Sequence, residues 1–232
     1  MICRTGRLMS PESTRGLPRA GLASYWLLAQ DNLDLQTIPD LSGHGNTLQL
    51  GSTGGVDAND PTLTQAGAVF DGVDDYGLCS MTLHGAGRTL VAVAKVPSDP
   101  AVYAMLQSGG YATYHAIAAG PVYFASDVFG GTQRYAHHPS ALSLDTWYFL
   151  ASRRATDHLN LWVNSSRYVA EVSGALAAVD LPWVGRFTDG ECPYHGTIAA
   201  LLSYDSALLD AEIARVYGWL KAELAPRGVT LA

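Results

Sequence analysis

The sequence has little of what binds nucleic acids or crosses membranes. Only 15% of its 232 residues are charged, just two of these are lysine, and the net charge of −7 goes with a pI near 5.3. Contacts to phosphate backbones need a basic face, so this balance argues against a nucleic-acid partner. No apolar run approaches the roughly 20 residues of a membrane-spanning helix, so membrane insertion is not expected.

Cysteine is scarce, and a recognisable signal peptide is lacking. Cys3, Cys79 and Cys192 are far apart, without the close spacing of a zinc site or a disulfide framework. We expect small buried thiols, and a disulfide between Cys79 and Cys192 is the alternative. Residues 21–29 form an apolar run, but it is short, contains Tyr and Trp and lacks a cleavage site. It therefore predicts a first core strand.

Glutamate occurs only five times. A glycosidase presents two carboxylates about 5 to 10 Å apart around the sugar bond, and the nearest approach is Asp-Gly-Glu at residues 189–191, in an expected turn. No Gly-x-Ser-x-Gly elbow is present. His137 and His138 precede Pro139 in an expected loop, with a metal-binding histidine pair as the alternative. The sequence therefore predicts no enzymatic activity.

What the chain does have is apolar residues, 48% of the total, in short segments separated by Gly, Pro, Asp and Ser. This spacing is typical of a β-sandwich or barrel. Residues 88–96 are mostly apolar on both faces, as in a central strand, and residues 146–154 and 157–165 resemble antiparallel neighbours. The two-residue link Ala155–Thr156 favours a hairpin between them.

One segment near the C-terminus, residues 210–224, has helical periodicity. Asp210 is a suitable N-cap, and Pro226 and Gly228 end the pattern. Its apolar positions follow one helical face: Ile213, Val216, Tyr217, Leu220 and Leu224. We expect this helix to pack against the sandwich or to cover one of its ends.

The first 20 residues contain four of the chain's arginines and little periodicity: Arg4, Arg7, Arg15 and Arg19. They predict an extended N-terminal arm outside a single domain of residues 21–232. The arm is either a frayed terminus or a basic peg that docks on a neighbouring subunit or a larger scaffold.

Residues 103–138 are the best candidate for a binding surface, because aromatic residues and histidines alternate there with glycines. Aromatic rings stack on sugar rings, and glycine-flanked loops allow close approach. Alternating tyrosines in strands are also common as core or cross-strand pairs, and that alternative stays open. The expected carbohydrate-binding residues are Tyr111, Tyr114, His115, Tyr135 and His137.

Several motifs carry a family resemblance: Ser24-Tyr25-Trp26, DLSGHGN at 40–46, FDGVDDY at 70–76, WYFLASR at 147–153, LWVN at 161–164, WVGR at 183–186 and the run 196–213. Their order and spacing resemble the laminin-G-like, concanavalin-A-like jelly-roll superfamily over roughly residues 22–224. One departure is Asn164-Ser165, where the superfamily has an Asn-Gly turn. The resemblance implies an all-β, two-sheet antiparallel β-sandwich of jelly-roll topology with one C-terminal helix.

Some branches of this superfamily bind calcium, so the resemblance also implies a calcium site. Calcium prefers hard oxygen ligands. The candidate ligands are Asp40, Asn46, Asp71, Asp74 and Asp75. The other interpretation of residues 69–76 is a tight acidic turn between two strands. There Gly72 supplies a positive φ, and the short Asp side chains bond to nearby backbone amides. No other cofactor is expected.

The superfamily includes lectin-like modules, adhesion domains and parts of bacterial-virus tails and capsid surfaces, so its fold alone does not fix a ligand. The missing signal peptide and the arm favour a non-enzymatic virion surface protein, a decoration or tail component made in the host cytoplasm. It would bind host-surface glycans and contact other virion or scaffold proteins through the arm, with a homo-oligomer left open. The alternatives are a purely structural assembly subunit and a cellular, extracellular lectin-like adhesion module.

Overall fold

The structure is a computed structural model that describes most of the chain. The described residues are 16–31, 33–83, 87–96, 103–107, 114–118, 122–129, 132–155, 158–171, 179–180, 183–187, 190 and 192–231. Between residues 103 and 133, and at 171 and 179–180, mostly the backbone is described. The predicted arm therefore lies largely outside the described residues, with Arg4, Arg7 and Arg15, whereas Arg19 lies inside them.

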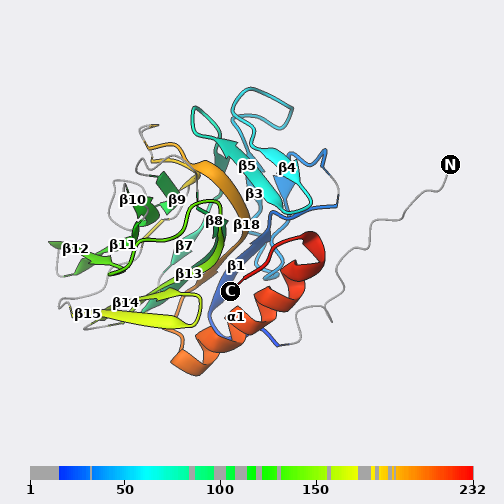
Figure 1. The fold of residues 1–232 in the computed structure, drawn as a ribbon. Coiled ribbons are helices and arrows are strands. Elements are labelled where there is room, and N and C mark those ends of the chain that lie inside the picture. Colours follow the sequence, from blue (N-terminus) through cyan, green and yellow to red (C-terminus); the bar gives the residue numbers. More distant parts are fainter. Residues whose placement is uncertain are drawn as a thin grey trace.

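Two antiparallel sheets form a sandwich, which confirms the predicted fold class (Figure 1). In the first sheet, seven strands follow the order β15-β14-β13-β8-β18-β5-β4, and an eighth, β1, also pairs with β18. Its strands are β1 (Leu22–Leu27), β4 (Thr62–Thr64), β5 (Gly67–Asp71), β8 (Arg88–Lys95), β13 (Trp147–Arg154), β14 (His158–Val163), β15 (Ser166–Glu171) and β18 (His195–Tyr204). The predicted central strand is β8, which lies between β13 and β18.

The second sheet also has eight strands, in the order β12-β11-β10-β9-β17-β6-β3-β2. They are β2 (Thr37–Ile38), β3 (Leu48–Leu50), β6 (Gly77–Leu78), β9 (Tyr103–Gln107), β10 (Tyr114–Ala118), β11 (Val122–Phe129), β12 (Thr132–His137) and β17 (Trp183–Val184). A separate two-stranded sheet pairs β7 (Thr82–Leu83) with β16 (Val179–Asp180).

The main core fills the space between the two large sheets. Trp26, Phe70 and Leu201 of the first sheet are fully buried there, together with Ile117 and Tyr123 of the second. Each such side chain contributes about 1.5 to 3 kcal/mol of hydrophobic free energy relative to an exposed one. Trp26 is one of the two aromatic residues of the first motif, and it belongs to this core.

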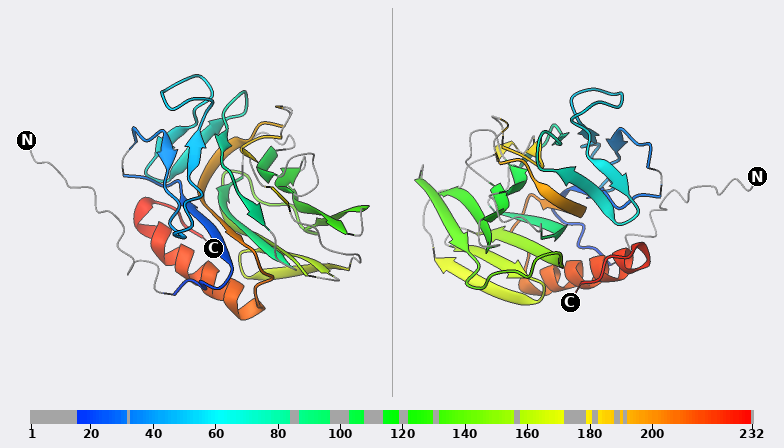
Figure 2. Two further views of the ribbon diagram at one scale, coloured as in Figure 1. Left: turned by 180° about the vertical axis from the view of Figure 1, so that it is seen from behind. Right: turned by 45° about the horizontal axis from the view of Figure 1, so that its top comes forward.

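A helix forms a third layer over the outer face of the first sheet (Figure 2). This helix, α1 (Asp210–Leu224), has the predicted bounds, and a 3-10 turn, Ala225–Arg227, follows it. Its apolar face packs on the sheet, and the ring of Tyr217 lies 5.3 Å from that of Phe149. Among the described residues α1 is the only α-helix, and none of them forms a helix long and apolar enough to span a membrane.

The start of α1 differs from the prediction. The N-cap residue is Leu209, so the prediction of Asp210 as N-cap is wrong, and Asp210 is the first helical residue. Its carboxylate pairs with Arg153 at 2.7 Å and also with Arg167. Glu212 accepts a hydrogen bond from the Leu209 backbone N–H at 2.8 Å and satisfies one of the free donors at the helix end.

The two predicted strands after residue 146 form an antiparallel pair, in which Leu150 faces Val163 in register. The next turn, at Asn164, joins β14 to β15. Asn164 has a φ of 52°, and its Oδ1 accepts a hydrogen bond of 3.0 Å from the Phe149 backbone N–H. Asparagine tolerates this left-handed conformation, so the turn forms without the glycine that the superfamily has.

The alternative disulfide between Cys79 and Cys192 is not formed, and both residues are partly buried. Burial raises the pKa of the Cys79 thiol to about 12. Cys79 therefore has the environment of a small buried hydrophobe, as expected.

Candidate functional site

One carboxylate holds the loop of residues 39–46 closed. Asp40 Oδ1 accepts hydrogen bonds from the backbone N–H groups of Tyr25 (3.0 Å) and Ser42 (2.9 Å). Its Oδ2 accepts from the Ser42 hydroxyl (2.7 Å) and from the Asn46 backbone N–H (3.0 Å). Four donors fill the roughly four lone-pair sites of a carboxylate. Asp40 is thus committed to fastening the loop to β1.

Asn46 fixes the far end of the same loop. Its Nδ2 donates to the Ala23 carbonyl at 2.8 Å, and its own carbonyl accepts from the Trp26 indole N–H at 2.6 Å. The buried Trp26 therefore has a partner for its one polar group. Among the described residues, none donates a hydrogen bond to the side-chain Oδ1 of Asn46.

Two glycines place His44 at the tip of this loop. Gly43 has a φ of 93° and Gly45 a φ of 79°, in the left-handed region that favours glycine. A Cβ at either position would meet no atom within 4 Å, so the backbone conformation alone accounts for glycine there. His44 is exposed, and its imidazole makes no hydrogen bond with the described residues.

His44 and Asn46 line an open pocket of about 440 Å³, which we name the His44 pocket. Its lining includes residues 21–23 and three further polar side chains, Arg19, Thr82 and Asp205. Pockets for small ligands have volumes of roughly 300 to 1,000 Å³. The pocket thus brings together an imidazole, an amide, a guanidinium, a hydroxyl and a carboxylate from distant parts of the chain.

Two turns hold Arg19 and Asp205 at this pocket. The Leu22 N–H donates to the Arg19 carbonyl at 3.2 Å, and the Asp205 N–H donates to the Gly21 carbonyl at 2.6 Å. Gly21 has a φ of 72°, and a Cβ there would lie 2.4 Å from Ser206 Oγ. Glycine is therefore required where the chain enters β1 beside the end of β18.

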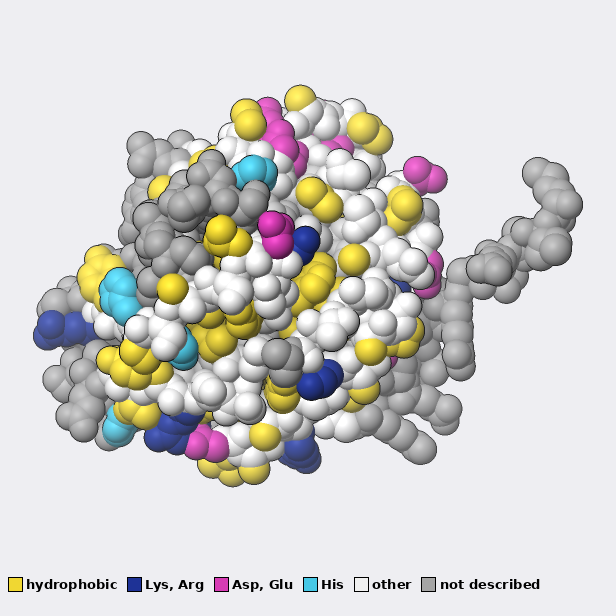
Figure 3. All heavy atoms as spheres, in the orientation of Figure 1, with side chains coloured by type: hydrophobic (Ala, Val, Ile, Leu, Met, Phe, Trp, Pro, Cys, Tyr) yellow, Lys and Arg dark blue, Asp and Glu magenta, His cyan; other side chains and the backbone are white. Residues whose placement is uncertain are grey.

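A second group of polar residues lies in the acidic turn after β5. Carboxylate oxygens of Asp71, Asp74 and Asp75 lie within 4.8 Å of one another. Asp71 Oδ1 accepts from the Val73 N–H (2.8 Å), and Asp75 Oδ2 accepts from the Asp71 N–H (2.7 Å). Figure 3 shows acidic side chains gathered at this end of the sandwich. These are the bonds of a tight turn, and the three carboxylates are also the residues that could hold a calcium ion.

Asp75 is the enclosed member of this turn, with only 5% of its surface exposed. Burial raises the pKa of its carboxyl to about 6; the hydrogen bond from Asp71 opposes this, and the charges of Asp71 and Asp74 add to it. Burial and these like charges disfavour the ionised carboxylate. A bound proton or a bound cation would reduce this free-energy cost.

The predicted calcium ligands are divided between two places. Asp40 and Asn46 belong to the loop of the His44 pocket, whereas Asp71 and Asp74 join Asp75 in the acidic turn. Among the described residues, the turn is the only place where three or more His, Cys, Asp or Glu side chains could share an ion. Calcium binding at Asp71, Asp74 and Asp75 stays a prediction.

The predicted carbohydrate-binding residues belong to the β10–β12 end of the second sheet. Tyr111 lies outside the described residues, and Tyr114 and His115 are described by their backbone only. Tyr114 and Tyr135 both pair in register with Ser126, so they occupy one row across three strands. His115 pairs with Ala125 in the next row.

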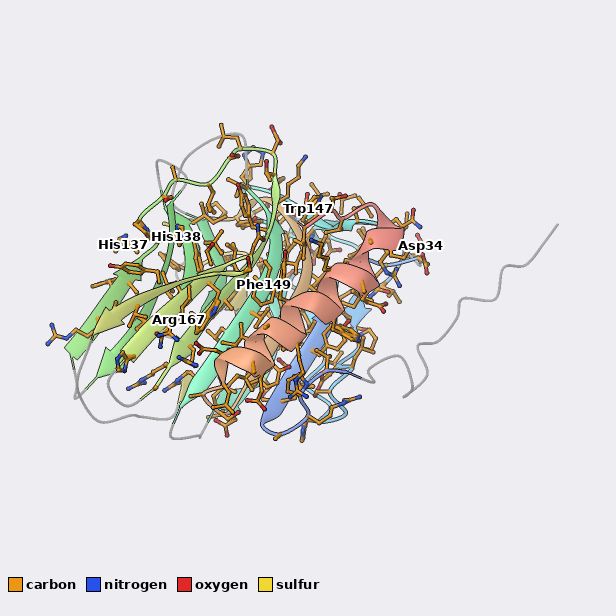
Figure 4. The ribbon with its side chains drawn as sticks, turned by 60° about the horizontal axis from the view of Figure 1, so that its bottom comes forward. Asp34, His137, His138, Trp147, Phe149 and Arg167 are labelled. Carbon is orange, nitrogen blue, oxygen red and sulfur yellow. The ribbon has the colours of Figure 1, made fainter. Side chains whose placement is uncertain are left out.

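The described side chains of this surface are those of β12 and the loop after it. Tyr135 is 50% exposed, His137 is exposed, and Ala136 between them is buried in the core. Figure 4 shows His137 and His138 at the edge of the sandwich away from α1. His138 Nδ1 lies 3.0 Å from the Ser140 carbonyl oxygen, an arrangement of the expected loop.

A smaller hollow of about 290 Å³ lies among β5, β8 and β18. Val69, Lys95 and His195 line it, and Asp145 reaches it from the loop before β13. Lys95 and Asp145 form an ion pair of 3.5 Å, and both side chains are substantially exposed. An exposed pair of this kind contributes less than about 1 kcal/mol.

Sequence reasoning missed three residues of the His44 pocket: His44, Thr82 and Asp205. The position of His44 between two glycines was a signal for an exposed loop tip. Nothing near Thr82 or Asp205 in the sequence indicates that these residues share a pocket with His44, because the strand pairing brings them there.

The sequence matches no protein-family model and no curated protein sequence. Solved structures with a similar fold include Trypanosoma rangeli sialidase in complex with sialic acid, with a TM-score of 0.66 and 13% identity over 90% of this chain. The receptor-binding domain of the botulinum neurotoxin C/D mosaic serotype has a TM-score of 0.65 and 13% identity over 86% of this chain. The binding domain of botulinum neurotoxin DC in complex with SialylT has a TM-score of 0.62 and 10% identity over 88%.

This chain spans 34% of the sialidase chain and 51% and 52% of the two neurotoxin chains. At such low identity the likeness shows the fold alone. It corrects the prediction that the chain has no enzymatic activity. Sialidases are enzymes, so a chain that shares a fold with them cannot be assigned to the non-enzymatic class because its glutamates are scarce. These neighbours share an all-β fold with this chain, and they give no support to the resemblance to the laminin-G-like, concanavalin-A-like superfamily or to its bacterial-virus members.

Proposed function

We propose that this chain is a glycan-binding β-sandwich domain and that the His44 pocket holds the sugar. The observation that carries this proposal is the chemistry of the pocket. Several hydrogen-bonding side chains line an open space of about 440 Å³ together with residues 21–23. Ligand sites commonly combine apolar contact with a few placed polar groups in this way.

The polar groups of the pocket match a sugar ring. Sugar hydroxyls both donate and accept hydrogen bonds, while the ring carbons present weakly polar faces. Asp205 and the Oδ1 of Asn46 can accept, Arg19 can donate, and the Thr82 hydroxyl and the His44 imidazole can do either. Ala23, which is partly exposed, can supply a small apolar contact.

The structurally similar proteins support the same class of ligand. Their names include complexes with sialic acid and with SialylT. Those ligands belong to those proteins, and only the general class of sugar ligand is proposed for this chain.

A second candidate surface is the outer face of β12. Tyr135 is 50% exposed there on a regular strand, and His137 follows two residues later. A half-exposed ring on a sheet surface can stack on a sugar, as the sequence suggests for this region.

A glycan array with the intact chain tests the proposal, and two variants separate the surfaces. His44→Ala removes an imidazole that makes no described hydrogen bond, so it should leave the fold intact and weaken binding to the recognised glycans. Tyr135→Ala should leave that binding unchanged. Loss of binding in Tyr135→Ala alone would move the site to β12, and no signal for the intact chain on a broad array would contradict glycan binding itself.

A narrower proposal is that the chain acts in host adhesion on the surface of a bacterial virus, with its arm contacting other virion proteins. It rests on the superfamily resemblance and on the arginines of residues 1–20. Deletion of residues 1–15 should then abolish co-assembly with virion proteins and spare sugar binding. A truncated chain that still assembles would contradict a role for these residues.

A further inference from the structure

We infer that Arg186 is the anchor of a second ligand site, which takes an oxyanion group: a carboxylate, a sulfate or a phosphate. None of its residues lines the His44 pocket, so the inference goes beyond the proposed function. Its basis is the state of the Arg186 guanidinium. Although the chain is acidic, with a net charge of −7, this guanidinium forms neither a hydrogen bond nor an ion pair with the described residues.

Two aromatic rings hold the guanidinium in place. Its Cζ lies 3.6 Å from the centre of the Tyr76 ring and 4.8 Å from the centre of the Trp183 ring. The two ring centres are 5.4 Å apart, and the ring planes are inclined at 50°. A cation is attracted to the face of an aromatic ring, but this contact gives its N–H groups no oxygen acceptor. The rings thus restrain the guanidinium and leave its hydrogen-bonding capacity unused.

The backbone that carries these rings is itself fixed. The Tyr76 N–H donates to the Asn59 carbonyl at 3.0 Å, and the Tyr76 carbonyl accepts from the Gly51 N–H at 2.8 Å. Trp183 belongs to β17, which pairs with β6 on one side and with β9 on the other. Both rings therefore belong to hydrogen-bonded parts of the second sheet and its loops, and the site is formed before a ligand arrives.

A glycine sets the path of the chain from Trp183 to Arg186. Gly185 has a φ of 89°, in the left-handed region that favours glycine. A Cβ at this position would lie 2.5 Å from the Phe70 ring, so the chain passes directly over that buried residue. The backbone before Arg186 is thus restrained by both its conformation and its packing.

The terminal N–H groups of Arg186 are the ones that a ligand can reach. Its Nε is buried and has no partner among the described residues, whereas Nη1 and Nη2 are not enclosed and the side chain is partly exposed. Guanidinium N–H groups lie in one plane and match two oxygens of a carboxylate, a sulfate or a phosphate. Because the rings already restrain the side chain, an anion loses less conformational entropy here than at a free surface arginine.

The acidic turn before Tyr76 limits the affinity. Asp75 Oδ2 accepts from the Asp71 N–H at 2.7 Å, and neither of these two carboxylates forms an ion pair with Arg186. Their charges nevertheless repel an approaching anion. We therefore expect a dissociation constant of about 1 mM for a small oxyanion.

An amide NMR titration of the intact, isotope-labelled chain tests the inference. The probes are sodium sulfate, sodium phosphate and sodium acetate at constant pH, with sodium chloride at the same ionic strength as the reference. At least one oxyanion should shift the signals of residues 183–187 and of the Trp183 indole N–H in a saturable way, whereas chloride should not. Comparison of the three anions shows which oxyanion group the site prefers.

Variants at Arg186 assign the binding to this residue. Arg186→Gln should weaken binding of the preferred anion about tenfold or more, because a charge-assisted contact is lost. Arg186→Lys keeps a cation beside the rings but not the planar fork, so it should retain part of the affinity. The matched control, Arg215→Gln, removes an exposed arginine of α1 and should leave binding unchanged. Thermal unfolding of each variant shows whether the fold is retained.

The outcomes separate this inference from the proposed function. No saturable shift of residues 183–187 with any of the three anions, or equal shifts with chloride, overturns the oxyanion site. Undiminished binding in folded Arg186→Gln or Arg186→Lys overturns it as well. Each of these results leaves glycan binding standing, because binding in the His44 pocket is observed at residues 19–23 and 44–46.

Discussion

Asp40 is the residue on which the shape of the pocket depends most. Its carboxylate accepts four hydrogen bonds, one of which joins the loop of residues 39–46 to Tyr25 of β1, while the other three close the loop on itself. Two of these donors belong to Ser42 and one to Asn46, on either side of His44. The carboxylate therefore links the stability of the loop to the position of two pocket residues.

Replacement of Asp40 by alanine should lower the free energy of unfolding by about 2 to 3 kcal/mol, because several enclosed N–H donors lose a charged partner. Urea denaturation measures this change. Ser42→Ala is the matched control, since it removes one hydroxyl donor and should cost about 1 kcal/mol. A loss below about 0.5 kcal/mol for Asp40→Ala would contradict the role assigned to this carboxylate.

Replacement of Asp75 should stabilise the folded chain at neutral pH, whereas replacement of Asp40 should destabilise it. Its folded pKa of about 6 lies above the ordinary value of 3.8. Between these two pH values the folded carboxyl keeps its proton while the unfolded chain has lost it, so the stabilising contribution is present at low pH and is lost as the pH rises through 6. Asp75→Asn keeps an oxygen acceptor for the Asp71 N–H and removes the charge.

We therefore expect Asp75→Asn to raise the free energy of unfolding at pH 7.5 by about 1 kcal/mol. The free energy of unfolding should also decrease less between pH 4 and 6 in the variant than in the parent chain. Denaturation curves at pH 4, 5, 6 and 7.5, with Asp74→Asn as the control, provide the measurement. A variant that is less stable than the parent at pH 7.5 would show that the charged form is needed.

At the scale of elements, α1 is fastened to the first sheet by an ionic contact as well as by its apolar face. Asp210 pairs with Arg153 of β13 and with Arg167 of β15. Burial raises the pKa of Asp210, but the hydrogen bonds and charges of the two arginines outweigh it, and the net pKa is lowered. This contribution is present above the unfolded pKa and is lost as the pH falls through the folded one.

Asp210→Asn should thus lower the free energy of unfolding at pH 7 by about 0.5 to 1 kcal/mol, because the pair is half exposed and screened by solvent. The difference from the parent chain should be smaller at pH 3 than at pH 7, because the contribution is lost as the pH falls through the lowered folded pKa. Asp31→Asn, which alters the longer 3.6 Å contact to Arg227, is the control. A deficit that is the same at both pH values would show that charge is not the cause.

The same helix shows where the sequence suffices for prediction. Periodicity predicted residues 210–224 and their buried face, because repeated apolar positions are a local signal. Local propensity also favoured Asp210 as N-cap, but the distant Arg153 and Arg167 bind its carboxylate instead. The pairing of β13 with β14 was also predictable from local signals, namely alternating apolar residues in two segments and a short link between them.

The pocket was not predictable in this way. Arg19, Thr82 and Asp205 meet His44 only because β1 pairs with the end of β18 and the loop of residues 39–46 folds onto β1. The sequence marked Asp40 and Asn46 as oxygen ligands for calcium. In this fold the Asp40 carboxylate accepts four hydrogen bonds, whereas Asn46 bonds through its Nδ2 and its backbone carbonyl. Order and spacing of motifs predict a framework, but not which loops share a pocket.

For the whole molecule, the acidic turn offers a prediction about metal. If Asp71, Asp74 and Asp75 bind calcium, millimolar calcium should raise the melting temperature by several degrees and EDTA should reverse the rise, because a ligand that binds only the folded state stabilises it. Asp71→Asn should abolish the shift, and Asp145→Asn, at a carboxylate outside the turn, should not. An unchanged melting temperature with either reagent would contradict the prediction.

The central claim is that the sandwich holds a sugar in the pocket built around His44. The most direct measurement is an amide NMR titration of the intact, isotope-labelled chain with the glycan that gives the strongest array signal. The account predicts that the signals of residues 19–23, 44–46, 82 and 205 shift together and saturate with one affinity. Shifts confined to residues 132–138, with those of the His44 pocket unchanged, would contradict it.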